Sequence, residues 1–156
     1  MSLSLYDITI PTFIRNFKIL STLLQKGLTH TSGNEEPLLT SRLIADMHAL
    51  PAQIQRASDV AKLTAVRLGK IPNEPWEDNE ATFADLQERI RKTIAFLEKV
   101  DPKSFDGMEE ENVSVGPPRN QKIMTGKDYV LQAALPNFYF HFTTAYALLR
   151  REGVPM

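Results

Sequence analysis

Cysteine is absent from the 156 residues of this chain. Its absence excludes disulfide bonds, thiolate metal ligands and a cysteine nucleophile, and it favours a reducing compartment, so we expect a cytoplasmic protein. The sequence also has no apolar run long enough to span a membrane, and the stretch from Met1 to Ile14 lacks the basic start and the cleavage site of a secretory signal. We therefore expect no membrane partner.

Charge of one sign is also scarce. The chain has 18 lysines and arginines against 19 acidic residues, a net charge of −1, and no long run of like charge. Because binding to nucleic acid requires a basic surface, we expect no nucleic-acid partner. Glycine-rich phosphate loops, Gly-x-Ser-x-Gly elbows, His-Glu-x-x-His pairs and EF-hand loops are missing as well. The sharp sequence signatures of catalysis are therefore absent.

Apolar residues at helical spacing are what the sequence does contain. The first stripe predicts a helix from about Leu5 to Lys26 and consists of Ile10, Phe13, Ile14, Phe17, Leu20 and Leu24. A loop over Thr29–Glu36, extended by Pro37, separates it from a second helix over Pro51–Leu68. The segment Ser41–Leu50 is compatible with an earlier turn of that second helix.

Capping residues predict two further helices. One runs over Thr82–Val100, where Thr82 and Asp85 approximate a capping box. The last runs from Thr125 to about Arg151. We expect Pro136 to kink this last helix, because an interior proline removes a backbone donor and clashes with the preceding turn.

The connections between these helices are irregular. Residues 71–77 contain two prolines and read as an extended segment, which Trp76 is expected to pin to the bundle. Residues 105–124 predict a long loop or a small hairpin ahead of the last helix. Four amphipathic helices with no sheet between them predict an all-α fold, an antiparallel four-helix bundle that forms one domain over residues 1–156.

The last helix is unusually aromatic. Phe138, Phe140 and Phe142 alternate with Tyr139 and His141, so large rings point in nearly all directions around its axis. A helix that is apolar on every side is either central or covered by a second subunit, which predicts a homodimer. The alternative is that these rings pack beneath the long loop.

The three histidines differ in context. His30 lies in a polar loop and is expected to be solvated, and His48 is expected to be capping or partly buried, with metal ligation as the less favoured role. His141 stands one turn from Asn137, on a face otherwise made of small and apolar groups. The other members of that face are Ala133, Ala134, Ala145 and Leu148.

This face predicts a ligand pocket. We expect Asn137 and His141 to face the bundle interior, where buried polar groups need partners that water, an ion or a small ligand can supply. Gln53 or Gln55 of the second helix would converge on the same space, with Tyr146 nearby. The alternative is that these side chains bond to one another, to a tyrosine or to a glutamine of the second helix, and leave no vacancy.

Several stretches resemble a known family. They are Glu77–Phe83, Ala134–His141, Leu148–Arg150 and Gly153–Pro155. They are similar to small proteins of unknown function within the DinB/YfiT-like four-helix bundles, and the similarity covers essentially the whole chain. The resemblance implies up-down-down-up connectivity, frequent homodimers and, in many relatives, a metal bound by three histidines. Some relatives are transferases or isomerases that use a low-molecular-weight thiol, which here would have to be an external cosubstrate.

The resemblance also implies where metal ligands would fall. In the superfamily one ligand comes from the second helix and two from a His-x-x-x-His on the last helix, ahead of a Leu-Leu-Arg-like ending. Aligned on that ending, the final histidine falls at His141 and the preceding ligand at Asn137, which is a poor substitute for an imidazole. The remaining ligand falls near Gln53, unless His48 takes its place.

Two functions are predicted as alternatives. The first is a degenerate, non-enzymatic member without the full metal triad or any cofactor, which binds a small ligand in the bundle interior around Gln53, Asn137 and His141. The second is an enzyme of transferase, isomerase or hydrolase type, in which His141 acts as a base or holds zinc or nickel together with His48, Asn137 or Gln53. A third, less favoured hypothesis is a partner-binding module that uses the connection around Trp76 or the long loop.

Overall fold

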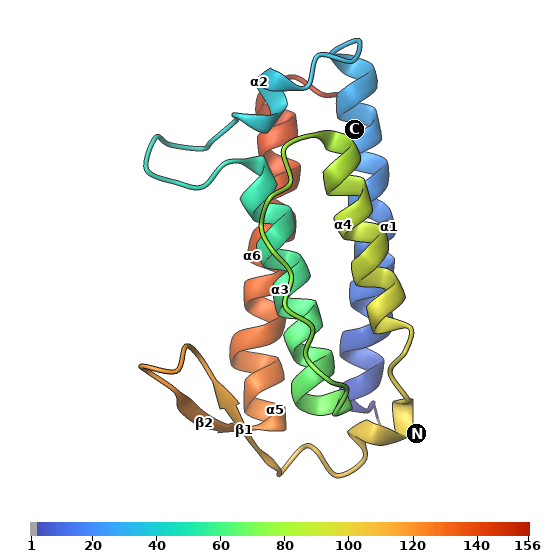
Figure 1. Ribbon diagram of the computed structural model, residues 1–156, viewed down its shortest axis with the longest axis vertical. Helices are drawn as coiled ribbons and strands as arrows, with labels where there is room; N and C mark the ends of the chain where they lie inside the picture. Colours follow the sequence, from blue (N-terminus) through green and yellow to red (C-terminus); the bar gives the residue numbers. More distant parts are fainter. Residues whose placement is uncertain (1–2) are drawn as a thin grey trace.

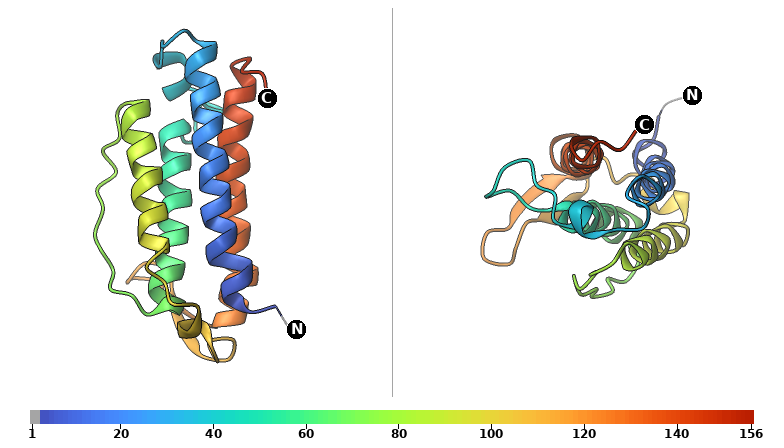
Figure 2. Two further views of the ribbon diagram at one scale, coloured as in Figure 1. Left: turned by 90° about the vertical axis from the view of Figure 1, so that its right-hand side faces the viewer. Right: turned by 90° about the horizontal axis from the view of Figure 1, so that it is seen from above.

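Four long helices dominate the computed structural model, which describes residues 3–156 (Figure 1). They are α1 (Leu5–His30), α3 (Leu50–Gly69), α4 (Phe83–Leu97) and α6 (Leu135–Arg151). Helices α1 and α6 run in one direction and α3 and α4 in the other, and α4 and α6 each pack against both α1 and α3 (Figure 2). The predicted all-α class and four-helix bundle are therefore confirmed, with up-down-down-up order.

Helix α1 begins with a reciprocal cap. The Ser4 hydroxyl accepts a hydrogen bond from the backbone N–H of Asp7 at 3.1 Å, and the Asp7 carboxylate accepts one from the backbone N–H of Ser4 at 3.0 Å. Pro11 lies in the second turn, near the start of the helix. The helix continues about one turn beyond the predicted end at Lys26.

The connection between α1 and α3 differs from the prediction. Pro37 does not extend a loop but lies in the first turn of the short helix α2 (Glu36–Leu39), where the fixed φ of proline suits a helix. Residues 40–49 are not helical, so α3 has no earlier turn. Pro51 lies in the first turn of α3, and its missing N–H explains why the helix starts there.

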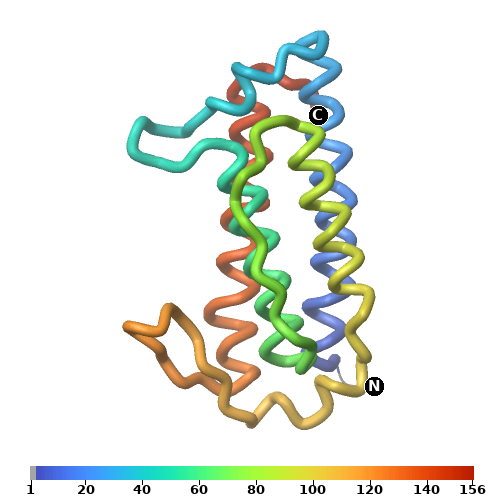
Figure 3. Tube along the Cα trace, viewed as in Figure 1, coloured from blue at the N-terminus to red at the C-terminus, as the bar shows by residue number. Residues whose placement is uncertain are grey.

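An extended segment joins α3 to α4. Because these two helices run in the same direction, the chain has to return along the bundle between them, and residues 70–82 do so in a segment that we call the strap (Figure 1, Figure 3). The Trp76 ring meets Phe96 of α4 edge-on at 5.5 Å between centroids. Lys62 of α3 donates to the carbonyl of Glu74 at 2.8 Å. The predicted pinning of this connection at Trp76 is confirmed.

The predicted hairpin is present before the last helix. After the single turn η1 (Pro102–Phe105), strands β1 (Asn112–Val115) and β2 (Lys122–Thr125) pair antiparallel, with Asn112 opposite Thr125. Gly116 begins the turn between them with φ +103°, and a Cβ there would lie 2.8 Å from the carbonyl oxygen of Asn120. Only glycine fits this position without strain.

The last helix contains a wide turn. Residues 126–151 are helical throughout, as α5 (Gly126–Tyr129), the π-helical turn η2 (Val130–Ala134) and α6. The Thr125 hydroxyl caps the start by accepting from the backbone N–H of Asp128 at 3.1 Å, as predicted. This π turn lies directly before Pro136, which has no backbone N–H to donate and stands in the first turn of α6.

The interior is apolar and includes part of the aromatic cluster of α6. The buried Phe138 ring contacts Phe13 and Phe17 of α1, at 4.5 Å and 5.5 Å between centroids. Phe138 therefore packs against α1 and not beneath the long loop. Within residues 3–156, no helix is both long and apolar enough to cross a membrane.

Candidate functional site

The imidazole of His141 lies between α6 and α3. The residue is only 8% exposed, and its Nδ1 is 2.8 Å from Oε1 of Gln53 on α3. Because an amide oxygen only accepts hydrogen bonds, Nδ1 carries the proton and donates, which leaves Nε2 as an acceptor. Nε2 has no hydrogen-bond partner among residues 3–156. Because every fully buried side-chain nitrogen or oxygen in this range has a partner, Nε2 is not fully buried and reaches the protein surface.

Electrostatics keep this ring neutral. Burial, with smaller contributions from the neighbouring Arg56 and His48, lowers the pKa of His141 to about 4. At neutral pH the ring is therefore uncharged, with a fixed tautomer and a free lone pair. Such a group accepts a hydrogen bond or ligates a cation, but it binds a proton only weakly.

His48 and Arg56 form the rim of this site. His48 is exposed and lies just before α3, where its backbone carbonyl accepts from the Gln53 amide at 3.1 Å. Its Nε2 is 2.9 Å from a guanidinium nitrogen of Arg56. Because arginine only donates, this ring nitrogen is the acceptor, so His48 is also held in one tautomer. A positive charge thus stands beside the two imidazoles.

Two of the predicted pocket residues lie elsewhere. Asn137 is exposed and does not face the bundle interior, which corrects that prediction; it borders a hollow of about 140 Å³ together with Leu63 of α3 and Ala133. Tyr146 is 40% exposed, because five residues of helix place it about 140° around the axis from His141. Gln55 instead donates to Glu80 at 2.8 Å. The structure therefore brings together Gln53 and His141, the glutamine pairing left open as an alternative to a vacant pocket.

A three-histidine metal centre does not fit these residues. The position implied for the second ligand on the last helix holds Asn137, whose side chain is exposed, and the carbonyl oxygen of Gln53 is already bonded to His141. The Nε2 of His48 is engaged by Arg56, whose charge opposes a nearby cation. Within residues 3–156, no group of three or more histidine, aspartate and glutamate side chains is placed to hold a metal ion.

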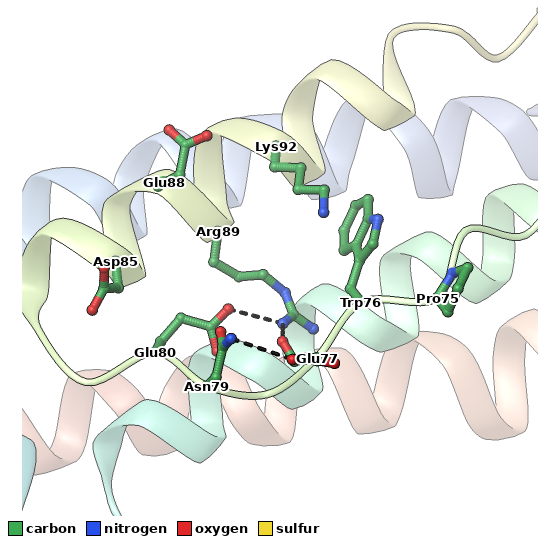
Figure 4. Close-up of a pocket in the computed structure, with 9 residues that line it drawn as sticks. All are labelled: Pro75, Trp76, Glu77, Asn79, Glu80, Asp85, Glu88, Arg89 and Lys92. Atoms are coloured by element: carbon green, nitrogen blue, oxygen red, sulfur yellow. Dashed lines mark hydrogen bonds and ion pairs between the residues drawn. The ribbon is translucent and has the colours of Figure 1, made fainter.

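Sequence reasoning missed a second polar cluster, centred on Arg89 of α4 (Figure 4). The Arg89 side chain is 2% exposed, and its Nη2 donates to Asp59 at 3.0 Å. Its Nη1 lies 3.0 Å from Glu80 and 3.1 Å from Asp78 of the strap, and its Nε donates to Ser58 at 2.8 Å. The sequence did contain a signal for this cluster, because Arg89 lies on the apolar stripe of its helix. A charge buried at such a position needs polar or charged partners.

Known proteins place this arrangement in a family. Residues 5–156 match the family described as "Domain of unknown function (DUF1993)". A crystal structure of a DinB family member from Shewanella denitrificans is similar over 97% of this chain and 88% of that chain, with 34% sequence identity and a TM-score of 0.86. No curated protein gives a significant match. The chain therefore belongs to the DUF1993 family of unknown function, and its fold is that of the DinB-like helical bundles.

Proposed function

We propose that this protein is a DinB-like binding protein that holds a small organic molecule at the junction of α3 and α6, with His141 as the recognition group and without the three-histidine metal centre. The observation that supports the proposal is the neutral His141 imidazole, which Gln53 holds in one tautomer. The Nε2 of this ring points outward as an unused acceptor. A buried ring held in one tautomer by a second side chain is a preorganised recognition element. The matching ligand group is a hydroxyl, an amide N–H or an ammonium.

The surroundings of His141 define the ligand further. Asn137 lies one turn earlier on α6, about 6 Å along the axis, so a ligand that spans one helical turn can meet both side chains. Arg56 is exposed and has guanidinium donors beyond the one that meets His48. A carboxylate would be stabilised there. The class that fits is a small acid that also carries a hydrogen-bond donor, such as a hydroxy acid or an amino acid.

The test observes the His141 ring directly. Imidazole nitrogen shifts are recorded by NMR while a panel of hydroxy acids and amino acids is added one compound at a time. We expect a saturable shift of the His141 Nε2 signal with at least one compound, loss of binding in His141→Phe and weaker binding in Arg56→Gln, while His30→Gln binds normally. A His141 signal that none of the panel perturbs would overturn the proposal.

The alternative function is an enzyme in which His141 is the base or a metal ligand. A pKa of about 4 makes a base that is poorly matched to neutral pH, where a catalytic pKa near the working pH is most effective. A neutral ring with a free Nε2 lone pair is better suited to ligate a metal than to act as a base. Titration calorimetry with zinc and nickel decides between the hypotheses: near-stoichiometric binding that is lost in both His141→Ala and His48→Ala supports the enzyme, and weak or unaltered binding supports the binding protein.

We also propose that the protein forms a homodimer through the outer face of α1 and α6. Tyr139 and Tyr146 are seven residues apart on one side of α6 and are 39% and 40% exposed. Asn16 of α1 lies 3.3 Å from the Tyr139 hydroxyl, and Ile19, one turn further along α1, is 43% exposed. Ile19, Tyr139 and Tyr146 are the exposed apolar side chains of this face, which a second copy would cover.

Sedimentation tests the dimer. We expect a mass of about twice 17.6 kDa for the wild-type chain and a shift to monomer in Tyr146→Glu. Phe140→Glu is the matched control, because Phe140 is 54% exposed but lies on a different side of the same helix. A wild-type chain that remains monomeric at high concentration would contradict this proposal and leave the His141 site untouched.

A further inference from the structure

A cleft opens between the strap and α4, and neither His141 nor Gln53 lines it (Figure 4). Its volume is about 490 Å³. The strap contributes Pro75, Trp76, Glu77, Asn79 and Glu80, and α4 contributes Asp85, Glu88, Arg89 and Lys92. We propose that this strap cleft binds a small organic cation, an ammonium or guanidinium compound, on the indole face of Trp76.

The Trp76 ring already attracts cations from its own chain. The ammonium of Lys92 stands 4.4 Å from the ring centroid, inside the cleft. Lys62 and Arg89 approach the same ring at 4.7 Å and 5.5 Å. Tryptophan is the aromatic side chain that binds cations best, through the negative face of its π system. The ring therefore has the chemistry of a cation site.

Lys92 differs from the other two cations because it is free to leave. Arg89 is bonded to Asp59 and Glu80, and Lys62 is buried and bonded to the carbonyl of Glu74. Lys92 is exposed and makes no hydrogen bond or ion pair with any residue from 3 to 156. Its ammonium therefore lies on the face of the Trp76 ring with no other bond to hold it, and a soluble cation can displace it into solvent.

The charge of the cleft selects a cation over an anion. Four carboxylates line the cleft, against two basic side chains, and the positive charge of Arg89 is balanced by acidic partners. Glu77 is exposed and has no basic partner among the described residues, so its charge remains available at the mouth of the cleft. An anion would meet mainly like charge, and only Lys92 would attract it.

The size and shape fit a small molecule. The volume lies in the range of about 300 to 1,000 Å³ that is typical of ligand sites. An elongated diamine or guanidino-amine can place one end on Trp76 and the other near Glu77 at the rim, since Glu88 is already paired with Arg91. Agmatine has a guanidinium at one end and an ammonium at the other, and it is therefore the probe of choice.

The test uses the fluorescence of Trp76, which is the only tryptophan of the chain and so reports on this cleft alone. The full-length protein is titrated with agmatine at constant ionic strength, and with sodium chloride and succinate as the salt and anion controls. We expect saturation with agmatine and no saturable response to either control. Because an exposed cation–π contact contributes about 0.5 to 1 kcal/mol, Lys92→Met should bind agmatine about two- to fivefold more tightly.

Charge-matched variants complete the experiment. Glu77→Gln should weaken agmatine binding, whereas Glu111→Gln, which removes an exposed carboxylate near the hairpin, should not. His141→Phe should bind agmatine as the wild type does, which separates this site from the one near α6. The inference is overturned if agmatine gives no saturable change in either the wild type or Lys92→Met. It is also overturned if succinate saturates the signal and Lys92→Met abolishes that effect, because the cleft would then be an anion site.

Discussion

Helix α3 buries polar side chains on two of its sides, and the two clusters are completed differently. On the side of α4, Arg89 is surrounded by Asp59, Ser58 and the acidic residues of the strap, so each of its three nitrogens donates to an acceptor. On the side of α6, the His141 ring has one nitrogen bonded to Gln53 and the other open. The comparison indicates that a saturated cluster holds the fold together, whereas a half-completed one leaves a group available for a ligand.

The saturated cluster has a mechanical role. The strap contains no regular secondary structure, so its position depends on side-chain contacts. Arg89 binds three successive parts of it, through the carbonyl of Glu77 and the carboxylates of Asp78 and Glu80. Burial raises the pKa of Asp59, and the charge of Arg89 acts in the opposite direction.

Loss of the Arg89 side chain should have the largest effect. Arg89→Met leaves Asp59 and Glu80 without their cation, and breaking a buried ion pair in this way lowers the free energy of unfolding by about 3 to 5 kcal/mol. Urea denaturation measures it. The control is Arg91→Met, which removes the exposed Arg91–Glu88 pair and should leave the stability almost unchanged, because solvent screens this pair. Equal effects of the two variants would remove the distinction between a structural and a surface arginine.

The next largest effect is expected from acid, which should lower the stability of the fold mainly by protonating His141. The pKa of His141 is lowered from 6.5 to about 4 in the folded chain, so between these values the unfolded chain binds a proton that the folded chain does not. Stability from this group is complete above pH 6.5 and is lost as the pH falls toward 4, by about 3 kcal/mol in total.

The measurement is a series of urea unfolding curves across that pH range. His141→Gln keeps a hydrogen-bonding side chain but cannot be protonated, so its stability should depend less steeply on pH than that of the wild type. His30→Gln should retain the wild-type slope. Parallel curves for the wild type and His141→Gln would mean that the ring titrates normally and is not desolvated.

A smaller effect is expected from the partner of the ring. Gln53→Leu removes the acceptor of the Nδ1 proton and the donor to the His48 carbonyl, and it should lower the free energy of unfolding by about 1 to 3 kcal/mol, since a buried donor is left unpaired. In NMR spectra the His141 ring should then lose its single tautomer. Gln55→Leu is the matched control on the same helix. If Gln53→Leu keeps the fixed tautomer, another group orients the ring.

The helices were predictable because their signals are local. The capping pair Thr82 and Asp85 and the apolar stripes lie within single segments, so spacing and side-chain type are sufficient to find them. The short helix α2 was mispredicted for the opposite reason. Proline suits the first turn of a helix and also a loop, and the choice between them depends on contacts with distant segments.

The site was only partly predictable. The sequence placed His141 on a face toward the second helix, and a glutamine partner was among the alternatives, because helical spacing fixes which side chains share a face. It did not predict that Asn137 is exposed, since that depends on where the neighbouring helices and the hairpin lie. The Arg89 cluster depends on the path of the strap, which returns along the bundle and which no local pattern encodes.

The π turn at Val130–Ala134 sets the rotational phase of everything that follows it. A π turn holds one residue more than an α turn would, and one residue of α-helix corresponds to about 100° of rotation. Deleting a single residue there would let an ordinary α turn cover the same rotation, so Tyr129 and the buried Phe138 would keep their present orientations. If the segment instead closed into α turns without losing a residue, everything after it would rotate by about 100°, and a different side of the last helix, with a different imidazole direction, would face α3.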